Sequence, residues 1–142
     1  MEESSINLAA IGVAVVANFF LGFLWYSVLF RDAWAKELGF DTSVKPPAGA
    51  LVKGLIMNVI GQFLLAYVFA HNIMAWTYVP EAQTMSSGAK ILNAAIFTWL
   101  GFYVPSDLSR VAWERASWKL FFINTGYHLA ILLVAATILN LM

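Results

Sequence analysis

The sequence predicts an all-α integral membrane protein whose four transmembrane helices form two helical hairpins of the same orientation. The first observation is composition. Apolar residues make up 61% of the 142-residue chain and charged residues only 11%, against about 45–50% and 25% in soluble domains. The second is charge distribution, because the intervals between charged clusters are long enough to cross a hydrocarbon core, which needs about 20 helical residues. The third is an internal repeat.

The repeat joins residues 21–34, LGFLWYSVLFRDAW, to residues 100–113, LGFYVPSDLSRVAW. Aligned without a gap, the two segments share eight of fourteen positions, including a glycine, an arginine and a tryptophan. Each segment ends an apolar run and enters a charged loop. Since each copy would contain two helices, we expect parallel repeats related by a pseudo-twofold axis along the membrane normal. The alternative is convergence of two helix ends that both favour interfacial residues.

The four helices are expected at about residues 6–30, 51–76, 88–104 and 118–141, in one domain (1–142) with hairpin repeats at about 1–76 and 80–142. The third helix should stop at Pro105, because proline lacks an N–H and its ring clashes with the preceding turn. A short surface helix is expected over residues 34–38. The first helix, preceded by Glu2 and Glu3, lacks the positive segment of a secretory signal.

Orientation follows from the lysines and arginines of the short loops. The middle loop has only Lys90, whereas the first and third loops with their flanks hold four and three: Arg31, Lys36, Lys45 and Lys53, then Arg110, Arg115 and Lys119. This asymmetry predicts a multi-pass membrane protein with both termini outside the cytoplasm.

Two segments also resemble a known family. The pattern G-x-x-W-Y-S-x-L-F-x-x-x-W (Gly22 to Trp34) and the segment WKLFFINTGYHLAILLVAATIL (Trp118 to Leu139) are similar to the DUF1761 family of small bacterial membrane proteins. Val28 departs from the proline that relatives often carry there. The family is one of unknown function, so the resemblance implies a small polytopic protein of the bacterial inner (plasma) membrane and transfers no active site.

Polar residues inside the predicted spans are the candidate site, because polar groups in hydrocarbon are costly and often functional. Depth can be counted from Lys53 and Lys119 at about 1.5 Å per residue. Asn58 and Asn124 then lie about 7 Å above the inner boundary, and Gln62 and His128 lie about 13 Å above it. The candidate ligand-binding residues are Asn18, Asn58, Gln62, Asn124, Tyr127 and His128. The alternative is interhelical hydrogen bonding, which stabilises such bundles without any ligand.

Other chemistries are disfavoured. All eight carboxylates are expected at helix edges or in loops, which leaves no intramembrane acid for an ion path and none to orient His128. We therefore predict no catalytic residues, no metal site and no cofactor. His71 and His128 are too far apart in depth to share a haem. A net charge of zero offers no basic patch for nucleic acid.

The predicted role is a homo-oligomeric binding or permeation unit for a small solute or a lipid, with membrane lipids as partners. Two alternatives stay open. One is a structural or accessory membrane protein that docks a partner. The other, less favoured, is a small membrane enzyme that uses His128.

Overall fold

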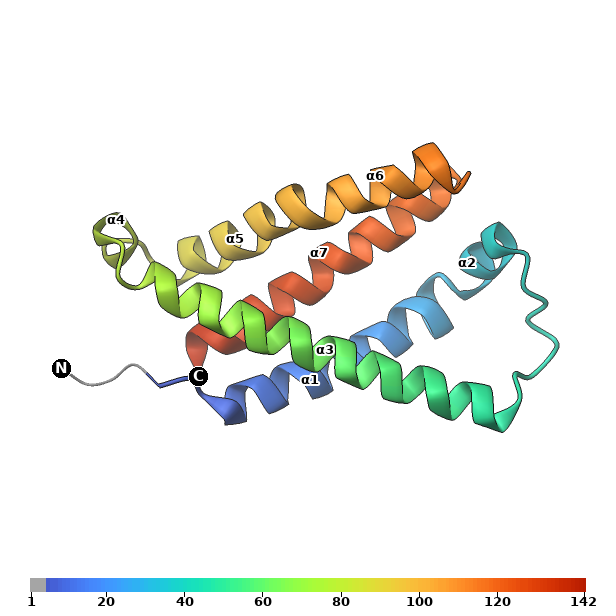
Figure 1. Cartoon of the computed structure of the whole chain (residues 1–142), viewed down its shortest axis with the longest axis horizontal. Helices are drawn as coiled ribbons and strands as arrows, with labels where there is room; N and C mark the ends of the chain where they lie inside the picture. Colours follow the sequence, from blue (N-terminus) through green and yellow to red (C-terminus); the bar gives the residue numbers. More distant parts are fainter. Residues whose placement is uncertain (1–4) are drawn as a thin grey trace.

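The structure is a bundle of helical rods. The computed structural model describes residues 5–142, so Glu2 and Glu3 lie outside the described residues. Figure 1 shows long rods running side by side, with short helices at the ends. In chain order the elements are α1 (Leu8–Phe23) with the π-helical segment η1 (Leu24–Leu29), α2 (Arg31–Leu38), α3 (Ala48–Trp76), α4 (Pro80–Gln83), α5 (Ser87–Thr98) with the π-helical segment η2 (Trp99–Tyr103), α6 (Val104–Trp113) and α7 (Trp118–Leu141).

Helix ends follow from local capping chemistry. The side chains of Asn7, Ser86 and Ser117 each accept a hydrogen bond from a backbone N–H in the first turn of α1, α5 and α7, which satisfies a donor that the helix itself cannot pair. Gly39 ends α2 with a left-handed φ of 75°, a conformation that glycine adopts without steric cost. Prolines fix φ at the ends of two loops, at Pro47 before α3 and at Pro80 in α4.

The loop between α2 and α3 carries its own local turn. The Asp41 carboxylate accepts hydrogen bonds from the Ser43 hydroxyl at 2.6 Å and from the Ser43 backbone N–H at 2.9 Å. Both bonds favour the charged carboxylate, so they lower the pKa of Asp41. The expected short helix over residues 34–38 is present as the last part of α2.

The helices have the length and surface of membrane-spanning segments. Three are long and apolar enough to cross a bilayer: Leu8–Leu29, Ala48–Trp76 and Trp118–Leu141. Large apolar side chains are exposed along these helices, such as Phe20 (64%), Val68 (63%) and Phe122 (66%). A soluble protein rarely exposes so much contiguous apolar surface, whereas lipid solvates it without cost. This composition and surface identify a membrane protein.

We number four rods of the described chain in order: α1 with η1, α3, α5 with η2 and α6, and α7. The third rod corrects one expectation, because its helix does not stop at Pro105. The helical path is continuous from α5 through η2 into α6 and ends only at Trp113. In η2 the chain takes a wider turn, in which the Val104 N–H bonds to the Trp99 carbonyl. Pro105 then falls in the first turn of α6, where a missing N–H costs little. The predicted end at residue 104 was therefore wrong by about two turns.

The core lies where small residues let the rods approach closely. Its fully buried alanines come from four different rods: Ala14, Ala66, Ala95, Ala135 and Ala136. Small residues are typical of packed membrane helices, since they bring backbones together without a cavity. α7 packs on α1, α3, α5 and α6 and carries the largest share of the buried residues, so it is the central element of the fold.

The packing is less symmetric than the repeat predicts. The hairpin partners α1 and α3 pack together, as do α5 and α7. A twofold relation between the hairpins would also pair α1 with α7 and, equivalently, α3 with α5. Only the first of these contacts is extensive over residues 5–142. The pseudo-twofold axis and the fourth membrane crossing, by α5 to α6, accordingly stay predictions.

Candidate functional site

A single turn of α7 gathers polar side chains in the middle of the bundle. Asn124, Thr125 and Tyr127 are buried, with 5–8% of their surface exposed, and His128 is about a quarter exposed. Each forms a hydrogen bond to a residue from another helix. Three of these side chains and their hydrogen-bond partners on other helices form what we call the α7 polar cluster: Asn124 with Tyr26, Tyr127 with Gln62, and His128 with Asp107.

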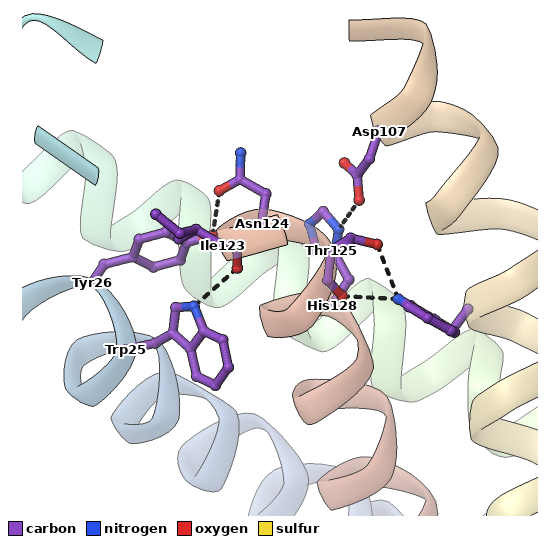
Figure 2. Close-up of polar contacts among 8 residues, drawn as sticks. Trp25, Tyr26, Asp107, Ile123, Asn124, Thr125 and His128 are labelled. Atoms are coloured by element: carbon purple, nitrogen blue, oxygen red, sulfur yellow. Dashed lines mark hydrogen bonds and ion pairs between the residues drawn. The ribbon is translucent and has the colours of Figure 1, made fainter. Parts of the chain in front are cut away.

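The shortest ionisable contact in the cluster joins α6 to α7. The Asp107 carboxylate Oδ2 lies 2.7 Å from Nδ1 of the His128 imidazole, as Figure 2 shows. The Asp107 side chain is only 6% exposed. The ring of Tyr103 lies beside the imidazole, with 4.6 Å between centroids. A carboxylate at Nδ1 accepts the proton there and leaves Nε2 as the available nitrogen, which fixes the orientation and the tautomer of the ring.

This contact corrects the expectation that every carboxylate lies at an edge or in a loop. A helix that ends at Pro105 would leave Asp107 in the following loop. Since α6 continues through Ser106 and beyond, Asp107 is carried on a helix that packs on α7. The objection that His128 lacks an orienting acid is thereby removed.

The internal repeat contained a signal for this residue. The first helix is predicted to reach Phe30, and the same offset in the second copy reaches Ser109. Applied consistently, the repeat would have kept Asp107, the counterpart of Val28, on a helix. Pro105 points the other way, because proline usually ends or kinks a helix. A prediction that follows Pro105 leaves Asp107 outside the helix.

The first rod is tied to the cluster by two side chains of η1. The Tyr26 hydroxyl donates to Oδ1 of Asn124 at 2.8 Å, and the Trp25 indole N–H donates to the carbonyl of Ile123 at 3.0 Å; both bonds are drawn in Figure 2. The Tyr26 and Tyr127 rings meet edge to face at 4.9 Å. The third rod has an equivalent tie, because the Trp99 indole N–H donates to the Thr125 carbonyl at 2.8 Å.

Two buried amides in this region have an oxygen without a partner. Gln62 donates from Nε2 to the Tyr127 hydroxyl at 3.3 Å, and Asn18 donates from Nδ2 to the Ile131 carbonyl at 3.3 Å. Their oxygens, Oε1 and Oδ1, are buried and accept no hydrogen bond. An unpaired buried acceptor costs free energy, about 1–3 kcal/mol. These oxygens are therefore places where a donor from a bound molecule would be favourable.

The structure places five of the six predicted site residues in or beside the cluster. Gln62, Asn124, Tyr127 and His128 are in contact or are joined through one neighbour, and Asn18 reaches α7 one turn further along at Ile131. Asn58 is the exception. It is exposed on the first half of α3, all of which is exposed, because α3 diverges from the other rods before Gln62.

Over the described residues of the single chain, the surface beside the cluster has no cavity that would hold a water-sized molecule. A shallow depression beside Asp107 and Asn124 is lined also by Arg110 and by parts of the α6–α7 turn. Within residues 5–142, no three His, Cys, Asp or Glu side chains lie close enough together to hold a metal ion. The arrangement can offer hydrogen bonds and a carboxylate–imidazole pair to a small polar group.

Comparison with known proteins gives one match. A family model described as "Protein of unknown function (DUF1761)" matches residues 9–140, nearly the whole chain. No curated protein and no solved structure is detectably similar to this chain.

The close approach of α1 and α7 at Gly22 generates a prediction. A Cβ at this position would lie 3.0 Å from the Tyr127 hydroxyl oxygen, whereas a Cβ at Gly12 on the same rod meets nothing within 4 Å. Because overpacking of a well-packed site costs about 1–3 kcal/mol, we expect Gly22→Ala to lower the thermal unfolding temperature in detergent. Gly12→Ala is the matched control and should not lower it. Equal effects of the two substitutions would contradict the described contact.

Proposed function

Because the chain belongs to the DUF1761 family, whose function is unknown, we propose its role from the geometry of the site: it is a membrane-embedded binding unit for a small polar solute or a lipid head group. The α7 polar cluster is the proposed binding site. The observation that carries the proposal is the contact of the buried Asp107 carboxylate with the partly exposed His128 imidazole, held at 2.7 Å between α6 and α7.

The energetics of such a pair favour a functional role over a purely structural one. Taking a carboxylate and an imidazole out of water is costly, and apolar replacements of a buried ion pair are often as stable or more stable. The helices are already joined by neutral hydrogen bonds from Trp25, Tyr26 and Trp99. An ionisable pair is not needed to hold them, and intramembrane ionisable residues commonly mark substrate or ion pathways.

The available groups suggest what the site recognises. With Asp107 on Nδ1, His128 presents Nε2 as a hydrogen-bond acceptor in the neutral ring. The unpaired oxygen of Gln62 is a second acceptor next to Tyr127. A ligand that brings two or more N–H or O–H donors would satisfy both, which fits a polar solute, or the hydroxyl or amine groups of a lipid head.

The setting of this site is also a proposal. Four crossings with both termini outside the cytoplasm of a bacterial inner membrane would place the cluster in the inner half of the bilayer. The beginning of α1 and the end of α7 do meet, through the Asn7 amide and the Met142 carbonyl at 3.3 Å, which supports an even number of crossings. The positive loops lie at the opposite end of the rods.

A homo-oligomer would complete the site and cover the exposed half of α3. Asn58 stands on that half with Gly54 four residues before it and Gly61 three residues after, all exposed and with open space beside both glycines. These spacings place the three on one helix face. An amide facing lipid is unfavourable, and small residues beside a polar one are typical of helix–helix contacts in membranes. A second copy would supply the amide partner.

An enzyme is the second candidate, because the structure adds the acid that the sequence analysis lacked. Asp107 orients His128 as carboxylates orient general bases. Among the described residues, no hydroxyl or thiol group forms a hydrogen bond to His128, so chemistry would have to come from a bound substrate or from water. We therefore favour binding without turnover over catalysis. A scaffold that docks a partner protein is the third candidate function.

Native mass spectrometry of the gently solubilised protein tests the proposal. We expect wild type and His71→Leu to carry a retained small molecule or lipid, and His128→Leu and Asp107→Asn to lose it while still folding. His71 is the matched control, since its hydrogen bond and its aromatic contact in the described part of the chain are both to Tyr67 of its own helix. A bound molecule whose mass changes on incubation would identify an enzyme instead.

A different result would refute the binding site. If His128→Leu retains the same molecule, the cluster is not where it binds. If wild type carries nothing, and His128→Leu only unfolds at a lower temperature, the cluster is structural, and partners should be sought for the charged loops.

The same spectra test the oligomer. We expect Asn58→Leu to shift the population from a defined oligomer towards monomer, because the amide contact between copies is lost. Val59→Leu, on a neighbouring exposed position of α3, is the control and should leave the oligomer unchanged. A wild-type protein that is monomeric at all detergent concentrations would contradict this arrangement.

A further inference from the structure

A second candidate site lies at the opposite end of the bundle from the positive loops. A cleft of about 730 Å³ is bounded there by the start of α1, the end of α3, α4, α5 and the end of α7. It exists because α3 and α5 are joined through α4 without packing closely against each other. In Figure 1 this region is at the left, where α4 bridges the green end of α3 and the start of α5. Its size is within the range of about 300–1,000 Å³ typical of ligand sites.

The lining changes in character along the cleft. Polar residues of the lining, which we call the mouth, come from α4, the first turns of α5 and the end of α3: Glu81, Lys90, Asn93 and Asn72. Apolar residues such as Trp76 and Met85 also line the cleft there. Apolar residues line the part that runs along α5 and η2 towards the middle of the rods: Ala94, Phe97 and Phe102, with Ile73 and Leu139 opposite. Phe97 and Phe102 are 69% and 75% exposed, so the cleft opens sideways, where lipid would lie.

The mouth holds two opposite charges that are not paired with each other. Lys90 is half-buried in the first turn of α5, and neither it nor Glu81 forms a salt bridge within the described part of the chain. The first turn of α5 adds backbone N–H groups, which favour an anion beside Lys90. The cleft thus offers the positive charge of Lys90 and the negative charge of Glu81 next to an apolar groove.

We propose that this cleft binds one zwitterionic phospholipid. Its phosphate lies at Lys90 and the start of α5, its amine lies at Glu81, and an acyl chain follows Phe97 and Phe102. An anionic lipid would leave the Glu81 carboxylate without a partner, and an apolar helix of a second copy would leave both charges unpaired. The proposal rests on the cleft alone and does not depend on the function proposed for the α7 polar cluster.

Lipid titration of the delipidated full-length protein, followed by native mass spectrometry, tests this site. We expect phosphatidylethanolamine to bind about tenfold more tightly than phosphatidylglycerol, a factor that one well-placed charge contact can supply. Lys90→Gln should weaken binding of both lipids, since both carry a phosphate. Glu81→Gln should remove the preference for phosphatidylethanolamine. Lys53→Gln, an exposed lysine at the other end of α3, is the control and should change neither affinity.

A substitution that fills the groove distinguishes the contribution of the groove to lipid binding from that of the two charges. Ala94→Trp adds a large side chain to the groove and should abolish the specific adduct while leaving both charges in place. Inorganic phosphate at millimolar concentration should not displace the lipid, because the acyl chain supplies much of the binding. Equal binding of the two lipids to wild type, full binding to Ala94→Trp, or displacement by phosphate would each overturn the proposal.

Discussion

The contact between the Asp107 carboxylate and the His128 imidazole constrains the second half of the protein. A buried carboxylate needs a partner, and within the bundle only a side chain on the facing helix can supply one. For Asp107 to reach His128, the third rod must continue as a helix beyond Pro105, which the wider turn of η2 permits. The same turn of α7 is held to the first rod by Trp25 and Tyr26. Hydrogen bonds to this one polar turn of α7 therefore join the first and third rods to α7.

Helix positions and the membrane class could be predicted from the sequence, because both depend on local hydropathy and on where prolines and charges fall. The gathering of Asn124, Tyr127 and His128 was also predictable, since they occupy one short stretch of one helix. Asp107 was missed because a local rule about proline was applied without the neighbouring π-helical turn, which no simple periodicity reveals. Asn58 lies apart from the cluster in the single chain for another reason. Equal depth in the membrane does not fix how far two helices diverge, and α3 leaves the bundle before that residue.

The two ends of the molecule offer different chemistry. The α7 polar cluster, near the positive loops, presents hydrogen-bonding groups in confined space and an oriented imidazole. The cleft at the other end presents a pair of separated charges above an open apolar groove. Between them lies the close-packed contact of small residues such as Ala14, Ala66 and Ala135, all fully buried. The absence of close packing between α3 and α5, which departs from the symmetry of the repeat, also leaves room for the cleft.

The most direct test of this account is nitrogen NMR of the protein labelled with ¹⁵N-histidine in lipid nanodiscs, with Asp107→Asn for comparison. The chain has two histidines, so His71 serves as an internal reference. We expect His128 to carry a proton on Nδ1, with a strongly downfield proton shift that moves upfield in Asp107→Asn while the His71 signals stay unchanged. A His128 ring protonated only on Nε2, with the same spectrum in both proteins, would show that Asp107 is not its partner and would contradict the proposed site.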